Sequence, residues 1–287
     1  PGPLGANAAV LCDDMLTIKE PPKRIADTSD FKGHTFFEGS SIRKIGDTYY
    51  FVYSSEKNHE LCYATSNFPD CDFRFRGTLV SNGDVGYHDR TERKRCNATG
   101  TTHGGMERIG DKWYIFYHRL THGSDYSRQM CAEQIEIMPD GGIAQVEMTS
   151  SGLNNGDLPG VGEYPAVICC NLTNGKMPHI ANRYCKDIPC ISHSGEEYFV
   201  GYAAKGTQII YKYFSVINGT KLYVTARGTG KLQVYLNNSY IGDMFFHEAE
   251  WKTKELRICE ACKHAELKLF VTSGKLDVLS LGFEMKK

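Results

Sequence analysis

Two stretches of this chain, residues 42–53 and residues 106–117, are copies of each other. Each copy reads as a strand, a Gly-Asp turn and a second strand rich in aromatic and β-branched residues, with the turns at Gly46-Asp47 and Gly110-Asp111. Such a repeat means that one supersecondary unit is used more than once. Because the unit consists of strands, it favours the blades of a β-propeller over a helical solenoid.

The repeated units extend over about residues 33–96 and 97–160, and polar residues precede each copy. Glu38 precedes the first copy and His103 precedes the second. The same position of each blade can face the central axis of a propeller. We therefore expect Glu38 and His103 to point at one shared pocket.

The rest of the chain also predicts an all-β protein, because helical periodicity is almost absent and short apolar runs alternate with Gly, Asn and Asp turns. Residues 8–11 and 15–18 read as two strands with a turn between them. The turn-rich residues 155–190 suit a linker or a covering strap. We expect two domains, a partial five-bladed β-propeller over residues 1–175 and a jelly-roll-like β-sandwich over residues 185–287.

The sandwich is expected from a series of short strands, some of which alternate with period two. These strands are expected over residues 208–214, 221–226, 231–236, 255–258, 266–271 and 276–283.

Bulk properties exclude some classes of partner. A net charge of -1 gives no support for binding nucleic acid or an anionic membrane, and no apolar run approaches the ~20 residues that span a bilayer.

The eleven cysteines are odd in number and show no tight framework, which favours reduced thiols and a cytoplasmic location. The chain begins at Pro1 without a starting Met or a secretory signal, so we expect its N-terminus to be missing.

The polar residues near the repeats have two readings each. Glu38 is either an edge glutamate or an acid whose pKa is raised by an apolar wall that includes Phe37, with Ser40 leaving room for a substrate. His103 is either structural or part of the same pocket. Arg128 is either a surface ion-pair partner or a clamp for a sugar hydroxyl or carboxylate.

Other chemistries have weaker signals. The chain has no GxSxG, HExxH, P-loop or GxGxxG motif in a fitting context. Cys131 paired with a histidine could act as a nucleophile, but no local signature accompanies it. Cys259 and Cys262 form a single CxxC motif. A role in metal binding or redox chemistry stays open, although no second pair of ligands accompanies the motif.

Ordered blocks of sequence resemble glycoside hydrolase family 43, the family of five-bladed propeller arabinofuranosidases and β-xylosidases. The blocks are residues 33–50, 59–66, 103–105, 113–119, 127–129 and 162–166. The resemblance implies an inverting enzyme with Glu38 as the general acid. It implies that His103 is the axial histidine, which in many members helps to hold a calcium ion or water, and that Arg128 contacts substrate.

The last ~100 residues resemble carbohydrate-binding module family 6 more weakly, through residues 212–214, 227–229 and 276–283. Sugar-binding modules need exposed aromatic platforms, and a set of tyrosines offers candidates, although most of them are expected in the core. They are Tyr198, Tyr202, Tyr211, Tyr235 and Tyr240. Trp251 is expected to pack within the sandwich.

One departure from the family is large. The family's base is an Asp on the first blade, and a second Asp on a middle blade tunes the acid. Both positions lie upstream of this chain, and Asp13 and Asp14 are expected in a turn. We therefore expect the C-terminal portion of the enzyme, inactive or nearly so alone.

The resulting expectation is a glycosidase for arabinose- or xylose-containing plant cell-wall polysaccharides or oligosaccharides. A non-catalytic carbohydrate-binding protein or inactive fragment is the alternative, and a purely structural β-protein is a third reading.

Overall fold

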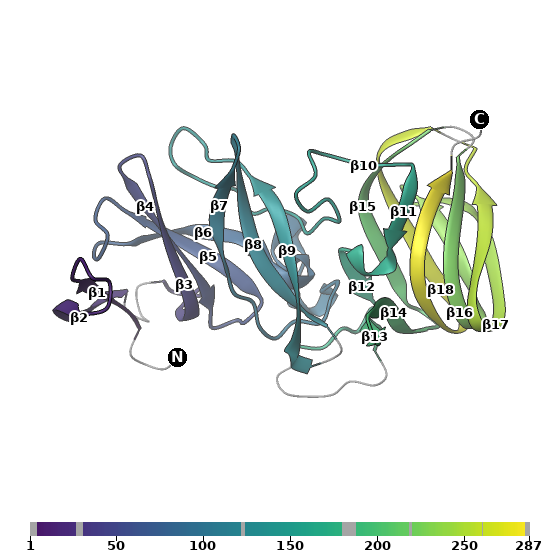
Figure 1. Cartoon of the computed structure of the whole chain (residues 1–287), viewed down its shortest axis with the longest axis horizontal. Coiled ribbons are helices and arrows are strands. Elements are labelled where there is room, and N and C mark those ends of the chain that lie inside the picture. Colours follow the sequence, from purple (N-terminus) through teal and green to yellow (C-terminus); the bar gives the residue numbers. More distant parts are fainter. Residues whose placement is uncertain are drawn as a thin grey trace. The chain divides into compact units, whose positions relative to one another are not determined.

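The computed structural model describes residues 5–26, 31–121, 124–179, 188–217, 220–259 and 261–284. Its regular structure is almost entirely β, so the expected all-β class is confirmed (Figure 1). The helical turns in the described ranges have three residues each, and none is long enough to cross a membrane. They are η1 (Asn82–Asp84), η2 (Tyr87–Asp89), η3 (Glu92–Lys94) and η4 (Ala166–Ile168).

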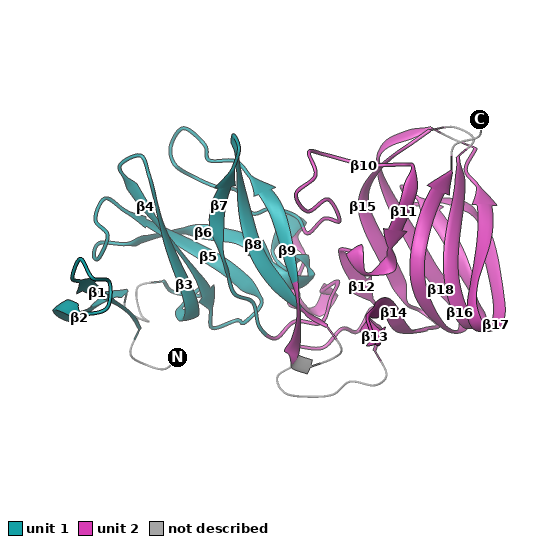
Figure 2. Cartoon of the chain, in the orientation of Figure 1, with its two compact units in different colours: residues 1–88, 101–119, 130–147 teal, residues 89–100, 120–129, 148–287 magenta. Residues whose placement is uncertain are grey.

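The chain divides into two compact units (Figure 2). The first unit comprises residues 1–88, 101–119 and 130–147, and the second comprises residues 89–100, 120–129 and 148–287. The expected boundary between residues 175 and 185 stays a prediction, and residues 180–187 lie outside the described part of the chain.

The first unit is built from a two-stranded hairpin and from sheets arranged as blades. The hairpin pairs β1 (Ala6–Leu11) with β2 (Ile18–Ala26). A four-stranded sheet has the order β3 (Phe36–Ile45), β4 (Thr48–Ser55), β5 (Glu60–Ser66) and β6 (Arg74–Ser81). A three-stranded sheet has the order β7 (Gly104–Ile109), β8 (Lys112–Thr121) and β9 (Ser124–Ile135). The end of β8 from Leu120 and the start of β9 up to Gln129 belong to the second unit.

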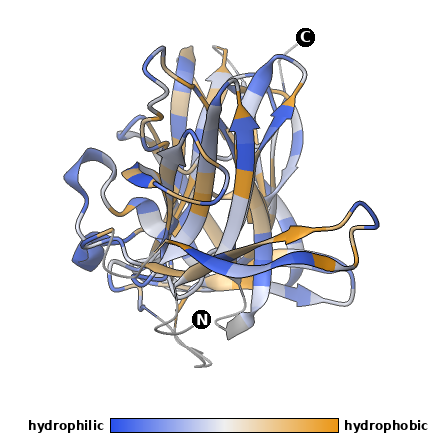
Figure 3. Ribbon diagram, turned by 90° about the vertical axis from the view of Figure 1, so that its left-hand side faces the viewer, coloured by the Kyte–Doolittle hydropathy of each residue, from blue (hydrophilic) through white to orange (hydrophobic). Residues whose placement is uncertain are grey.

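The turn of the β1–β2 hairpin is longer than expected. Asp14 Oδ1 accepts the backbone N–H groups of Leu16 and Thr17, both at 2.9 Å, and Asp14 Oδ2 accepts the Thr17 hydroxyl at 2.6 Å. A short acidic side chain that binds the backbone two and three residues ahead stabilises a turn. The second strand therefore begins at Ile18. Met15 and Leu16 in this turn are exposed. Hydrophilic and hydrophobic segments alternate along the ribbon in Figure 3.

The repeat corresponds to the hairpins β3–β4 and β7–β8. Ile45 pairs with Thr48 in the first and Ile109 pairs with Lys112 in the second, so the Gly-Asp pairs form the turns as expected. The first strands of the two hairpins lie close together, because Arg43 of β3 and Glu107 of β7 form an ion pair at 3.2 Å. Equivalent positions of the repeat thus face each other, as they do in neighbouring propeller blades.

The second unit contains a nine-stranded system with β18 at its centre. Its strands are β10 (Leu158–Pro159), β11 (Gly162–Pro165), β12 (Asn171–Thr173), β13 (Cys190–Ser194), β14 (Glu197–Ala204), β15 (Gln208–Val216), β16 (Lys221–Leu236), β17 (Ser239–Arg257) and β18 (Cys262–Glu284). Strand β18 pairs with β11, β14, β15 and β16, so one long strand holds most of the unit together.

Two details of this unit differ from the sequence prediction. The expected strands 221–226 and 231–236 are halves of the single strand β16, and 266–271 and 276–283 are halves of β18. Strands β10, β11 and β12 occupy part of the turn-rich residues 155–190. They pair with β15 or β18, so this part of the segment completes the sheet.

Candidate active site

The strand that carries Glu38 is irregular at this residue. In the β3–β4 ladder Phe36 pairs with Ser55, Glu38 pairs with Ser54 and Ser41 pairs with Val52, so the register shifts on both sides of Glu38. From Ser41 onward the pairing is regular. Such bulges bend a strand and redirect a side chain, and they are common next to functional sites. The equivalent hairpin β7–β8 keeps one register from Gly104 to Ile109.

Glu38 and His103 lie in contact. The repeat predicted that they point at one shared pocket; the contact agrees with this, and the pocket itself stays a prediction. Glu38 Oε1 and His103 Nε2 are 2.8 Å apart, and about a third of each side chain is exposed to solvent. Gly39 makes room for this contact: with φ +67°, a Cβ at this position would lie 2.6 Å from His103 Cδ2. The ring of His118 meets the ring of His103 edge-on, with centroids 5.5 Å apart.

This pair can move a proton. In one protonation state the His103 imidazole donates a hydrogen bond to the Glu38 carboxylate, and in the other the Glu38 carboxylic acid donates to a neutral imidazole. Both side chains are also accessible to a ligand. A carboxylic acid held in a fixed direction at a solvent-accessible position meets the geometric requirement for a general acid.

The other predicted residues near Glu38 are placed as follows. Phe37 is half-buried and lies within the first register shift of β3, while Ser40 is exposed within the second. The neighbouring Phe36 packs into the aromatic core of the blade, with its ring 5.9 Å from those of Phe51 and Tyr53. The roles of Phe37 and Ser40 in substrate binding stay predictions.

Arg128 belongs to the second unit, where it lines a pocket of about 980 Å³. The other lining residues include two tyrosines that are well exposed, Tyr126 at 86% and Tyr198 at 53%. Charged and polar groups complete it, among them Glu163, which accepts a hydrogen bond from Ser280 at 2.7 Å. Aromatic faces beside carboxylates and an arginine suit a ligand rich in hydroxyl groups.

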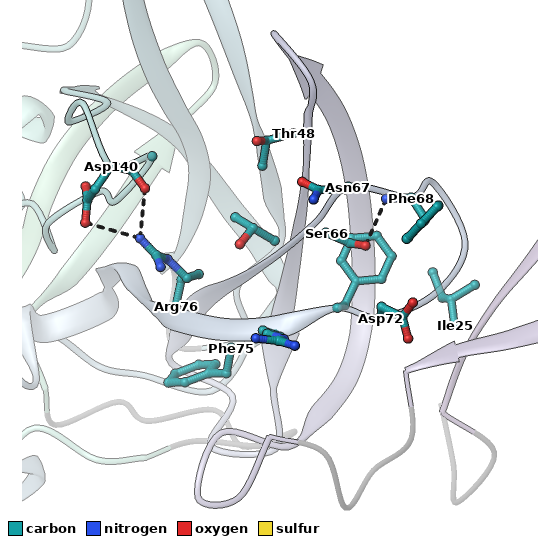
Figure 4. A pocket seen from close by; sticks show the side chains of 13 residues that line it. Ile25, Thr48, Ser66, Asn67, Phe68, Asp72, Phe75, Arg76 and Asp140 are labelled. Carbon is teal, nitrogen blue, oxygen red and sulfur yellow. Dashed lines mark hydrogen bonds and ion pairs between the residues drawn. The ribbon is translucent and has the colours of Figure 1, made fainter.

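A second pocket, of about 910 Å³, lies in the first unit (Figure 4). Arg76 crosses it and binds Asp140 through both the side chain, at 3.4 Å, and the backbone carbonyl, at 3.3 Å. Phe68 at its rim is 54% exposed. Neither Glu38 nor His103 lines this pocket, so its size does not identify it as the site of the predicted chemistry.

The expectation that most of the candidate tyrosines lie in the core is wrong. Of the five, Tyr211 is fully buried in the core, whereas Tyr198 and Tyr240 are each 53% exposed. Tyr202 lies under the Lys275 ammonium and Tyr235 lies under that of Lys268, at 4.5 and 4.8 Å from the ring centroids.

Trp251 is half-buried and held by polar partners. Its Nε1 donates to Glu197 at 2.7 Å, and the Arg227 guanidinium covers its ring at 4.2 Å. Trp251 thus lies outside the core cluster of this unit, with a charged side chain over its ring, and its expected packing within the sandwich stays a prediction.

Sequence reasoning missed the buried polar residues of the first unit. Tyr117 donates to Glu133 at 3.1 Å, and Glu133 is only 4% exposed. Burial, followed by the nearby Glu133 carboxylate, raises the pKa of Tyr117 well above its usual value. Tyr117 ends the second copy of the repeat, so its aromatic pattern indicated core packing and carried no signal of a charged neighbour.

Comparison with known proteins relates the N-terminal half of the chain to one family. The model for glycosyl hydrolases family 43 matches residues 5–143. A protein named xylosidase/arabinosidase from Thermoclostridium stercorarium is 51% identical over 179 residues, which are 60% of this chain and 38% of that protein. The chain covers 38, 42 and 44% of three curated relatives, which is less than half the length of each.

Solved structures show more distant likenesses. A GH43 β-xylosidase/α-arabinofuranosidase from a compost microbial metagenome, in complex with xylotriose and in a calcium-free form, is 27% identical, with a TM-score of 0.40 over 50% of this chain and 43% of that chain. A protein named CsCBM6-3 from Clostridium stercorarium, in complex with cellobiose, is 16% identical, with a TM-score of 0.37 over 46% of this chain and 99% of that chain.

Proposed function

We propose that this chain is part of a glycoside hydrolase that cleaves arabinose- or xylose-containing plant polysaccharides or their oligosaccharides, because residues 5–143 are related to glycosyl hydrolases family 43. The observation that carries the proposal is the contact between Glu38 and His103 at 2.8 Å. It joins an acid and an imidazole from neighbouring copies of the repeat, both open to a ligand.

In the proposed reaction Glu38 is the general acid. Its carboxylic acid donates a proton to the glycosidic oxygen as the bond to the anomeric carbon breaks, and a water molecule attacks that carbon from the opposite face of the sugar. His103 orients the Glu38 carboxyl through the Oε1–Nε2 contact. We assign the base to no residue of this chain, since Asp14 is engaged in the β1–β2 turn.

Calcium remains a proposal that the donor set supports weakly. Calcium prefers six to eight oxygen ligands. His103 offers nitrogen, and its Nε2 already faces Glu38. Among the described residues, Glu38 is the carboxylate in contact with His103. A calcium ion bound at this pair would therefore take most of its oxygen ligands from water. We derive no catalytic step through it.

The first test is hydrolysis of an aryl α-L-arabinofuranoside and an aryl β-D-xyloside by this chain and by its Glu38→Gln variant. General acid catalysis contributes roughly 10²–10⁴-fold to a rate. The loss in Glu38→Gln should therefore be large for an unactivated disaccharide and smaller for an aryl glycoside, whose leaving group needs less protonation. A Glu255→Gln variant, altered at an exposed ion pair with Lys221 in the other unit, is the matched control.

The general acid assignment is wrong if Glu38→Gln hydrolyses both kinds of substrate as fast as the parent chain. Because no base is assigned within these residues, a folded parent chain that hydrolyses neither kind is the expected result, and the same comparison is then made in a chain that also includes the upstream blades of the family. A parent chain that hydrolyses both kinds in a Glu38-dependent way would contradict the expected inactivity and would mean that a base lies within these residues.

A carbohydrate-binding function is the second candidate, and the pocket around Arg128 favours it. Tyr198 exposes half of its surface there, beside Arg128 and Glu163. We propose that the second unit binds sugars and in this respect resembles carbohydrate-binding module family 6. In affinity electrophoresis with xylan and arabinan, Tyr198→Ala should lose retardation while Tyr240→Ala, an equally exposed tyrosine outside the pocket lining, should keep it.

A further inference from the structure

We propose that His34, Glu60 and Cys62 form a binding site for a zinc-like divalent cation. These residues offer an imidazole nitrogen, a carboxylate oxygen and a sulfur that all lie within 4.8 Å of one another. Nitrogen, oxygen and sulfur donors at this spacing match the preferences of Zn²⁺. The site is independent of the proposed glycosidase chemistry, since its three ligands include neither Glu38 nor His103.

The distances are close to those of a tetrahedral site. His34 Nδ1 is 3.7 Å from Cys62 Sγ and 2.8 Å from Glu60 Oε1. With zinc–ligand bonds of about 2.0–2.3 Å, tetrahedral angles place a nitrogen and a sulfur about 3.6 Å apart and a nitrogen and an oxygen about 3.3 Å apart. The nitrogen–sulfur distance already fits, and the nitrogen–oxygen distance must open by about half an ångström.

The fold fixes two of the ligands directly. Glu60 and Cys62 are two positions apart on β5, so their side chains leave the same face of the strand. Both residues are buried. Their spacing cannot change without disrupting pairing with β4 and β6, where Cys62 lies opposite Tyr53 and Thr78.

The third ligand is held from outside the strand. His34 precedes β3, and its ring stacks on Phe75 with centroids 4.7 Å apart. Its carbonyl accepts the Tyr53 hydroxyl at 2.7 Å, and its N–H donates to Phe31 at 2.7 Å. A ring fixed on an aromatic face, with both backbone groups bonded, presents its nitrogen in one direction.

Outer contacts orient the carboxylate, as they do around established metal ligands. Ser55 donates to Glu60 Oε1 at 2.6 Å and Thr78 donates to Oε2 at 3.2 Å. The Lys57 ammonium lies 3.6 Å from Oε1, so a positive charge is already drawn to this place. Its side chain is 35% exposed and can move into solvent when a divalent cation binds.

An entry path and a fourth ligand position are also present. The His34 side chain is 29% exposed, whereas that of Glu60 is 5% exposed, so the cluster opens to solvent on the histidine side. Water can complete the coordination there. On binding, the Cys62 thiol loses its proton to solvent and the sulfur–metal bond forms, with no change in oxidation state.

The simpler alternative is a buried ion pair between His34 and Glu60 beside a neutral thiol. The two readings differ in one observable, a sulfur–metal bond. Cobalt(II) reports this bond directly, because a thiolate ligand adds a charge-transfer absorption and tetrahedral coordination intensifies the visible bands of the ion.

The experiment titrates Co²⁺ into chelator-treated protein that carries Cys259→Ser and Cys262→Ser, which removes the only CxxC. We expect one equivalent of Co²⁺ with a thiolate charge-transfer band, displaced by Zn²⁺. Cys62→Ser should abolish the band and His34→Gln should weaken binding at least tenfold. Lys57→Met should strengthen it several-fold, because the competing ammonium is gone.

The outcomes separate clearly. Absence of the band at millimolar Co²⁺, or its survival in Cys62→Ser, overturns the proposal. If Cys62→Ser does not fold, as judged by circular dichroism and its melting temperature, His34→Gln and Lys57→Met decide the question, and equal affinity in these variants and the parent chain also overturns it. Cys71→Ser, at a partly exposed thiol of the same unit, should leave the band unchanged.

Discussion

At the residue scale, burial raises the pKa of one thiol and of two tyrosine hydroxyls. The pKa of the Cys190 thiol is raised to about 11 from an ordinary value of 9.0, first by burial and then by Asp277. Burial likewise raises the pKa values of the Tyr53 and Tyr117 hydroxyls. Each group binds its proton more tightly in the folded chain than in the unfolded chain.

The sign of the resulting pH dependence follows from this difference. The stabilisation is fully present below the unfolded pKa values and is lost as pH rises, from about pH 9 to about pH 11 for Cys190. Urea unfolding at pH 8, 9, 10 and 10.5 should show a falling free energy of unfolding. Cys190→Ala should reduce the slope, and an equal slope in the two proteins would contradict the assignment.

Gly39 tests the Glu38–His103 contact without changing either residue. An alanine Cβ at φ +67° would lie 2.6 Å from His103 Cδ2, so Gly39→Ala should push the imidazole away from Glu38. We expect altered imidazole resonances of His103 in NMR spectra and, in a chain that hydrolyses glycosides, at least a tenfold lower rate.

The matched control is Gly46→Ala, which has φ +60° and open space around the added Cβ. Both variants should lose about 1 kcal/mol of stability from the backbone conformation. If the His103 resonances of both variants match those of the parent chain, Gly39 is not required for the Glu38–His103 contact.

At the element scale, the backbones of β16 and β18 approach each other closely at Gly230 and Gly274. A Cβ on Gly274, which has φ +72°, would lie 1.9 Å from the Thr229 carbonyl oxygen. Gly274→Ala therefore adds a backbone clash to the unfavourable φ. Overpacking typically costs 1–3 kcal/mol. The free energy of unfolding should fall by roughly that amount more than in Gly46→Ala, and equal losses would contradict the predicted clash.

The same elements show what a local pattern can predict. The Gly-Asp turns and the strands around them were predictable, because the two-residue turn and the alternation of aromatic residues are both local. The local pattern predicts two strands in place of each of the long strands β16 and β18, and this prediction is wrong. Their glycines signal breaks locally, but pairing between β16 and β18 continues past the glycines and across a register shift, from Gly230 with Gly274 to Leu232 with Val271.

At the scale of the whole molecule, β10, β11 and β12 extend the sandwich toward the N-terminal side of the predicted boundary. Leu158 and Leu172 from these strands are 3 and 5% exposed in its core, and Ala166 is fully buried. The Tyr164 ring packs edge-on against Phe214 at 5.1 Å. A fragment that begins at residue 185 loses all of these contacts.

We therefore expect residues 148–287 to be more stable than residues 185–287. Each fully buried large apolar side chain contributes about 1.5–3 kcal/mol, so the difference should reach several kcal/mol. Urea denaturation of the two fragments, followed by tryptophan fluorescence of Trp251, measures it. Equal midpoints would show that β10–β12 do not stabilise the sandwich.

The sequence by itself determined the all-β class, the repeated hairpins and the pairing of Glu38 with His103, because strand alternation, turn residues and repeats are written in neighbouring positions. Tertiary structure decided the rest. The register shifts around Glu38, the pocket around Arg128, and the meeting of His34 with Glu60 and Cys62 depend on residues brought together from distant parts of the chain. No local pattern encodes such meetings, because they follow from how whole strands pair and pack.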